Sequence, residues 1–176
     1  MLVTLDTSHL ERSPLKLSAP GKGSLFGYPG PRPSSIVTMM SHRTHFLDCS
    51  ISEAFSRAEN PIKQLVVLGS GWDTRCYDLP KNSDVKCFEV DMAPTLNVKK
   101  DALIKSGIKS THVTFVETEF NQESWMDSLL ASRFDQSKTT YILWEGVTMY
   151  LTNEAVNSTL ALFSTLPQGS VIGADF

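Results

Sequence analysis

Apolar residues in this chain gather in short runs that alternate with stretches in which they recur every three or four positions. The short runs are bounded by glycine, proline or polar residues, a pattern typical of buried strands. Strands are expected at 64–68, 85–90, 112–117, 140–144 and 171–174. Because stretches of helical spacing separate these strands, we expect an α/β fold with a mostly parallel sheet, flanked by helices and built with right-handed crossovers.

Capping and breaking residues bound the helical stretches. Helices are expected at 43–58, at 92–107, at 122–132 and after Thr152 or Asn153. Asn121 is expected to cap the third helix, because its side chain can accept a hydrogen bond from a backbone N–H of the first turn. In the last helix, Val156, Leu160 and Phe163 are expected to form one buried stripe.

The N-terminal part of the chain differs from the rest. Residues 13–35 contain five prolines and four glycines, which disfavour both helices and central strands. Residues 1–35 are therefore expected to form a loosely ordered arm, either a disordered tail or a cover for the substrate, and residues 36–176 the folded domain. Nothing follows the last expected strand, so we expect a domain that is incomplete at its C-terminus, with the final strands of its fold missing.

Composition narrows the function classes. The 176 residues are 41% hydrophobic and 20% charged, as in ordinary globular proteins, and the net charge of −3 argues against nucleic acid as a partner. No apolar run approaches the roughly 18 residues that span a bilayer. Cys49, Cys76 and Cys87 follow no metal spacing, so we expect free buried thiols, no metal and, without a signal-peptide pattern, a cytoplasmic location.

A glycine turn follows the first strand. Gly69-Ser70-Gly71 ends the apolar run, and Asp91 ends the second strand. In open α/β sheets this pairing holds a nucleoside-containing cofactor, because the glycines admit the ligand close to the backbone and the acid binds ribose hydroxyls. Thr74 stands where the dinucleotide pattern has its third glycine, and no phosphate loop is present. A cofactor with a ribose but no phosphate, such as S-adenosylmethionine, fits better than NAD or FAD.

Two further acids near strand ends are candidates for cofactor binding. Glu89 lies on the same face of its strand as Asp91 and could share its role or lie in solvent at the sheet edge. Glu119 could bind the exocyclic amine of an adenine, and Phe120 could stack on the ring. The alternative for these two residues is a solvated carboxylate and a core phenylalanine.

Glu145 ends the fourth strand, where parallel sheets bind ligands. An unpaired carboxylate after an apolar run is costly to bury, so a cationic partner is expected, such as the α-amino group of the cofactor's methionine part. Arg43 is either the partner of the cofactor's carboxylate or a surface residue, and Asp73 is expected to cap the segment after the glycine turn.

Taken together, these motifs resemble the leucine carboxyl methyltransferase superfamily, in particular its bacterial-type S-adenosyl-L-methionine-dependent methyltransferases. The resembling blocks are Arg43–Asp48, Val67–Arg75, Phe88–Asp91, Phe115–Phe120 and Trp144–Leu151. The combination of Leu-Gly-x-Gly-x-Asp-Thr-Arg with Glu-Val-Asp and Glu-Gly-x-x-x-Tyr-Leu is fairly specific. The family usually has Asp-Leu in place of Glu119-Phe120, and its members are considerably longer.

This resemblance implies a Rossmann-like class I methyltransferase fold and S-adenosyl-L-methionine as cofactor. It assigns the methionine carboxylate to Arg43, the ribose to Asp91 and the methionine amino group to Glu145. Gly69 and Gly71 would line the cofactor, Glu119 and Phe120 would flank the adenine, and Tyr150 would lie towards the methyl acceptor, which is a small molecule or a protein C-terminal carboxylate.

The expected reaction is direct displacement at the sulfonium, for which the protein mainly positions the nucleophile and excludes water. A carboxylate acceptor needs no base at pH 7, whereas a hydroxyl acceptor would need one. Two other functions remain open from the sequence: a non-catalytic, truncated methyltransferase-like domain, and a nicotinamide-dependent oxidoreductase.

Overall fold

The computed structural model describes residues 34–78, 84–121 and 124–175 and shows a five-stranded, fully parallel sheet with the order β3-β2-β1-β4-β5. The strands are β1 (Gln64–Leu68), β2 (Lys86–Asp91), β3 (Val113–Glu117), β4 (Thr140–Trp144) and β5 (Val171–Ala174). The chain runs outward from β1 to β3 and then returns to the other side of β1. The predicted Rossmann-like α/β fold is confirmed, and the strand order reverses between β1 and β4.

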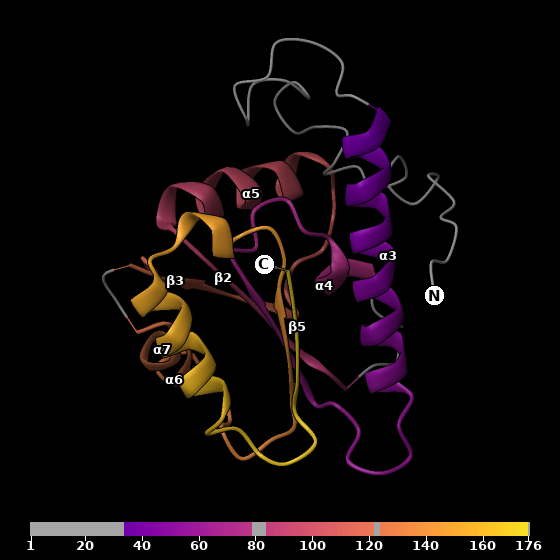
Figure 1. Cartoon of the computed structure of the whole chain (residues 1–176). Coiled ribbons are helices and arrows are strands. Elements are labelled where there is room, and N and C mark those ends of the chain that lie inside the picture. The colour runs from indigo at the N-terminus through magenta and orange to yellow at the C-terminus, as the bar shows by residue number, and fades with distance from the viewer. Residues whose placement is uncertain (1–33, 79–83, 122–123, 176) are drawn as a thin grey trace.

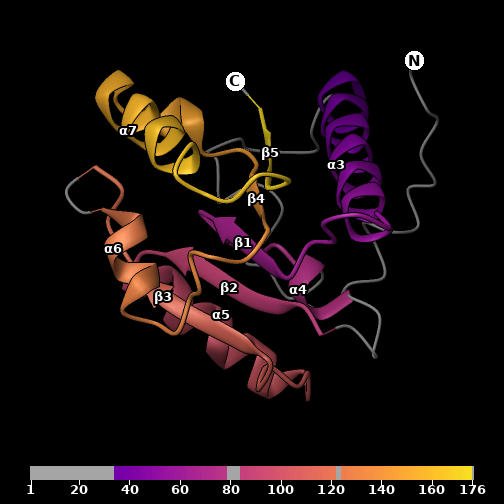
Figure 2. The ribbon, with the colours of Figure 1, turned by 90° about the horizontal axis from the view of Figure 1, so that it is seen from below.

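Helices cover both faces of this sheet. They are α3 (Ser34–Phe55), α4 (Arg75–Asp78), α5 (Ala93–Lys105), α6 (Trp125–Leu130), the 3-10 helix η2 (Thr148–Tyr150) and α7 (Asn153–Phe163). Figures 1 and 2 show α6 and α7 on one face, and α3, α4 and α5 on the other. In the part of the chain that the structure describes, no helix combines the length and the apolar character needed to cross a membrane.

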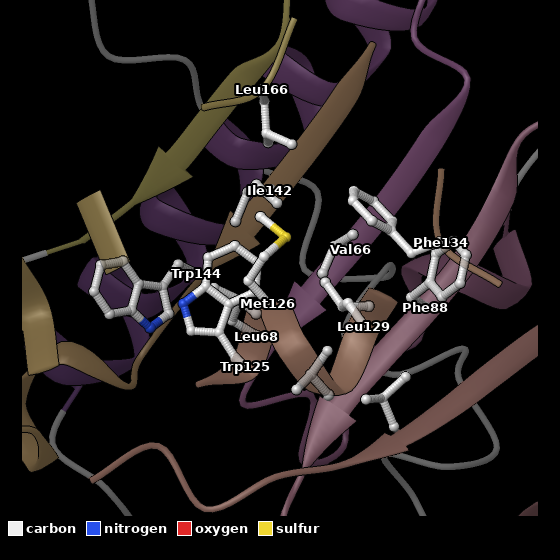
Figure 3. Packing of buried hydrophobic residues seen from close by; sticks show 12 residues of the cluster. Val66, Leu68, Phe88, Trp125, Met126, Leu129, Phe134, Ile142, Trp144 and Leu166 are labelled. Atoms are coloured by element: carbon white, nitrogen blue, oxygen red, sulfur yellow. The ribbon is translucent and has the colours of Figure 1, made fainter. Parts of the chain in front are cut away.

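The sheet separates two hydrophobic clusters, because successive side chains of a strand point to opposite faces. Val66 and Leu68 of β1 belong to the cluster beneath α6 and α7, whereas Leu65 and Val67 belong to the cluster beneath α3. Figure 3 shows the first cluster, in which side chains of β1, β2 and β4 meet those of α6. Every residue of β1 is buried, as expected for the central strand of a parallel sheet.

Helix α3 begins at Ser34, nine positions before the predicted start of 43. Its first turns carry Val37 and Met39 exposed, so hydrophobic periodicity does not mark them. Its buried residues, Leu47, Ile51 and Ala54, are those that the sequence indicated. Residues 1–33 of the predicted arm lie outside the described residues, and Ser34 and Ser35 belong to the helix.

Two other local predictions need correction. Ser124, not Asn121, caps α6 by accepting a hydrogen bond from the Asp127 N–H at 3.3 Å. The Asn121 side chain instead accepts from the N–H of Thr152, which caps α7 as expected. Cys49 is exposed, whereas the other two cysteines are buried and free as predicted.

The buried stripe of α7 includes Thr159 where Leu160 was predicted. Leu160 is exposed, and Thr159 accepts a hydrogen bond from the indole N–H of Trp125 at 3.2 Å. The indole N–H of α6 needs an acceptor once it is buried, and the threonine hydroxyl supplies it. This hydrogen bond between the two helices therefore favours an orientation of α7 in which Thr159 faces inward.

Leu129 and Leu130 test this packing from adjacent positions of α6. Leu129 is fully buried and Leu130 is 44% exposed. We expect Leu129→Ala to lower the free energy of unfolding by about 2–5 kcal/mol, because it leaves a cavity in the cluster. Leu130→Ala should change it by less than about 1 kcal/mol. Urea unfolding of both variants measures the difference, and equal losses would contradict this packing.

Candidate functional site

The glycine turn after β1 closes over the end of β2. The Gly69 and Ser70 N–H groups both donate to the Val90 carbonyl, at 2.8 and 3.1 Å. Gly69 and Gly71 have φ values of 67° and 38°, in the left-handed region that favours glycine. The glycines therefore permit the backbone conformation that brings three successive N–H groups towards β2.

Asp91 is fixed by two of these backbone groups. Its Oδ2 accepts from the Gly71 N–H and its Oδ1 from the Met92 N–H, each at 2.7 Å. The side chain is nearly buried at the carboxyl end of β2, and each oxygen keeps a second lone pair for a further donor. Beside it, a Cβ on Gly71 would approach no atom closer than the Gly69 carbonyl, at 3.9 Å. Space for a ligand therefore adjoins this carboxylate.

Glu145, at the end of β4, meets its cationic partners within the protein. Its Oε1 accepts from the Arg43 Nε at 2.8 Å and from the Thr44 hydroxyl at 3.0 Å, and its Oε2 accepts from an Arg75 N–H at 2.7 Å. The prediction that this carboxylate needs a cation is confirmed. In this structure two arginines fill that role, and Oε2 keeps a lone pair for a further donor.

Arg75 is a further site residue, which the sequence alone did not indicate although it ends the Leu-Gly-x-Gly-x-Asp-Thr-Arg motif. Its guanidinium pairs with Asp48 of α3 at 2.5 Å, with Asp73 at 2.5 Å and with Glu145 at 2.7 Å. Burial alone would lower the pKa of Arg75, but the three carboxylates outweigh burial and raise it. Asp73 also accepts from the Arg75 N–H at 2.8 Å, so its predicted structural role at the start of α4 is confirmed.

Asp175 is a second residue that the sequence analysis overlooked. It follows β5, and its carboxylate accepts from Arg43 at 2.7 Å and from the Gly146 N–H at 2.6 Å. Asp91, Glu145 and Asp175 each stand at the carboxyl end of a strand, so the rule that identified the first two also applies to the third. Arg43 thus joins α3 to the ends of β4 and β5.

The residues predicted to flank an adenine lie beyond the end of β3. Glu119 is exposed, and Phe120 is half-buried against the hydrophobic cluster beneath α6 and α7. Tyr150 lies in η2, the segment after β4, and is 62% exposed. The structure therefore brings Arg43 and Glu145 into contact and joins Gly71 to Asp91, while it leaves Glu119 and Tyr150 at the surface.

Glu89 has neither of the roles that the sequence analysis considered. It is fully buried, and its Oε2 lies 2.7 Å from Nζ of Lys99, which is fully buried as well. Lys99 comes from α5, and the crossover that packs this helix on β2 is what brings the two charges together. Glu89 therefore does not lie in solvent at the sheet edge, and its burial against Lys99 keeps it from sharing the role of Asp91.

Charge distinguishes the two ends of the sheet. Near the carboxyl end, five acids (Asp48, Asp73, Asp91, Glu145 and Asp175) face two arginines (Arg43 and Arg75), an excess of three negative charges. A shallow depression of about 200 Å³ lies at the opposite, amino end, and its lining combines three lysines (Lys63, Lys86 and Lys138) with two aspartates (Asp84 and Asp135). No group of three or more metal-binding side chains occurs among the residues described. The excess of acids at the carboxyl end favours a positively charged ligand.

Comparison with known proteins agrees with this geometry. The family model of the leucine carboxyl methyltransferases matches residues 28–164. A "Putative S-adenosyl-L-methionine-dependent methyltransferase" of Mycobacterium sp. (strain KMS) is 32% identical over 137 residues, which cover 77% of this chain and 44% of that protein. YktD of Bacillus subtilis (strain 168), which has the same description, is 37% identical over 117 residues, or 65% of this chain and 38% of that protein.

Among solved structures, that of PKMT2 from Rickettsia typhi in complex with AdoHcy has a TM-score of 0.48 and 15% identity, over 69% of this chain and 23% of that one. The chain spans less than half the length of the two sequence relatives. Since the family match extends over more than three quarters of its residues, this chain belongs to the leucine carboxyl methyltransferase family.

Proposed function

We propose that this protein is an S-adenosyl-L-methionine-dependent methyltransferase. The observation that carries the proposal is the convergence of the Gly69–Gly71 turn, Asp91 and Glu145 at the carboxyl ends of β1, β2 and β4, respectively. This is the point where the strand order reverses, and open α/β sheets bind their ligands there. Family membership supports the same cofactor and disfavours a nicotinamide.

The chain's residues fit the parts of this cofactor. Asp91 would accept hydrogen bonds from the ribose hydroxyls, and its two backbone donors hold the carboxylate in position. Glu145 would bind the amino group through its Oε2, while Arg43 would bind the carboxylate. Glu119 and Phe120 are proposed to flank the adenine. The cofactor carries a net positive charge, which the acidic excess at this end of the sheet favours.

The bound cofactor supplies a methyl group on a sulfonium, which an incoming nucleophile displaces. The protein's part is to hold the donor and the acceptor in line and to exclude water. We propose a carboxylate acceptor, on a small molecule or a protein C-terminus, because it is already a nucleophile at neutral pH. Tyr150 would lie towards the acceptor. A hydroxyl acceptor would need a base in addition. Two buried, free cysteines support a reducing, cytoplasmic location.

Calorimetric titration of the purified chain with S-adenosyl-L-methionine tests the cofactor. Incubation with a labelled methyl donor and panels of carboxylate and hydroxyl acceptors then tests the reaction. Methylation of carboxylate acceptors, to methyl esters, without methylation of hydroxyl acceptors would support the full proposal. Binding without turnover would leave a non-catalytic domain, and a folded chain that binds NADH instead would refute the assignment.

Asp91→Asn is the most direct variant of the proposed ribose contact. The amide keeps the size of the side chain but loses the charge that strengthens hydrogen bonds to hydroxyls. We expect about 2–3 kcal/mol weaker binding of S-adenosyl-L-methionine, or roughly 30- to 150-fold, in calorimetry. Asp101→Asn, on the exposed side of α5, is the matched control and should bind as the wild type does. Equal affinities of the two variants would argue against the ribose role.

Gly69 and Gly107 form a second matched pair, because both have a φ of 67°. An added Cβ would meet nothing within 4 Å at Gly107, whereas at Gly69 it would overlap the Val147 side chain. Gly107→Ala should therefore lower stability by about 1 kcal/mol through backbone strain alone. Gly69→Ala should cost about 1–3 kcal/mol more and weaken cofactor binding, because the turn must move. Thermal unfolding and calorimetry measure both effects, and identical variants would contradict this account of the turn.

A further inference from the structure

The buried pair of Glu89 and Lys99 lies directly beneath the glycine turn. Both side chains are completely inaccessible to solvent, and their charged atoms are 2.7 Å apart. Burying an ion pair usually adds little stability over an apolar pair of similar size, because both charges lose their hydration. The position of the pair therefore calls for a reason other than stability.

Lys99 also contacts the turn itself. Its Nζ lies 3.5 Å from the carbonyl oxygen of Ser70, the residue between the two glycines, and forms a long hydrogen bond. The N–H of the same residue donates to Val90, and the N–H of Gly71 donates to Asp91. The backbone donors thus hold the turn against β2. The Ser70 carbonyl, between the two glycines, accepts a hydrogen bond from the Asp73 N–H at 2.7 Å in addition to the longer one from Lys99.

The groups around this lysine keep it in place. Nζ lies 5.7 Å from the centre of the Tyr77 ring, a distance suited to a cation–π contact. The ring of His112 packs edge-on against the same tyrosine ring, and its Nε2 forms a hydrogen bond with the Cys76 carbonyl at 2.8 Å. Burial raises the pKa of the Glu89 carboxyl, and Lys99 opposes this effect. The carboxylate of Glu89 compensates the lysine's charge, and the aromatic ring limits the lysine's movement.

We propose that Lys99 is a positioning residue that fixes the Gly69–Gly71 turn in its cofactor-binding conformation without touching the cofactor, while Glu89 serves to neutralise its charge. This inference rests on the proposed function for its effect on affinity. Its effect on the turn does not depend on any ligand. Removal of the lysine should therefore make the turn less rigid and weaken cofactor binding. Removal of only one charge of the pair should instead lower the stability of the fold.

Two variants separate these effects. Glu89→Gln keeps the ammonium group on Ser70 but leaves its charge without a counterion, so we expect lower stability with affinity within about twofold of the wild type. The double variant Glu89→Gln with Lys99→Met removes both charges and the contact with Ser70. It should regain most of the stability yet bind S-adenosyl-L-methionine about fivefold more weakly, the effect of one lost hydrogen bond.

Lys100 and Glu117 provide the control, because they also join α5 to the sheet but form an exposed pair at 3.7 Å. Lys100→Met with Glu117→Gln should change neither stability nor affinity measurably. Urea unfolding, calorimetry and hydrogen exchange of the Ser70 and Gly71 amides are measured on the whole chain for all variants. In the Glu89/Lys99 double variant we expect both amides to exchange faster relative to those of the β1 core.

The outcomes are distinguishable. Faster exchange at the turn with weakened binding in the double variant supports the positioning role. Wild-type exchange and affinity in that variant would overturn it and leave the pair a purely structural one. If the wild type itself does not bind the cofactor, the proposed function fails, and the exchange rates alone decide whether Lys99 holds the turn.

Discussion

The guanidinium group of Arg75 is the interaction on which the arrangement of the carboxyl edge depends. It pairs with acids from three parts of the chain: α3, the segment after the glycine turn, and the end of β4. A charge this far from solvent is stable only because each side of it meets a carboxylate. The pairing with Asp48 attaches α3 to the carboxyl edge of the sheet, and Arg43 of the same helix lies beside Glu145.

A second group of buried charges lies on the same face of the sheet. Lys99 and Glu89 join α5 to β2. The negative charge of Asp73 raises the pKa of both Arg75 and Glu89, so it links the two groups electrostatically. The glycine turn runs between these two groups. Glycine-rich backbone is costly to order, so a turn of this composition needs contacts on several sides to keep one conformation. Here the end of β2, an ion pair and an arginine cluster provide them.

In the described part of the chain, apolar side chains dominate the packing on the opposite face of the sheet. Strand alternation sends Val66, Leu68 and Phe88 to the cluster beneath α6 and α7, which is almost entirely apolar. The hydrogen bond between the Trp125 indole and Thr159 is one polar contact within this packing. One face of the sheet therefore supplies packing, and the other supplies both packing and the charged groups that shape the site.

The sequence by itself determined the strands, the parallel sheet, the glycine turn and the acids Asp91 and Glu145. These features follow from local signals: apolar runs bounded by breakers, and polar residues at the carboxyl ends of those runs. Tertiary structure alone decided that Glu89 is buried against Lys99, that Thr159 rather than Leu160 faces inward, and that Arg43 and Arg75 converge on Glu145. Each depends on a partner ten to a hundred positions away, and no periodicity encodes which distant side chain will satisfy a buried charge or donor.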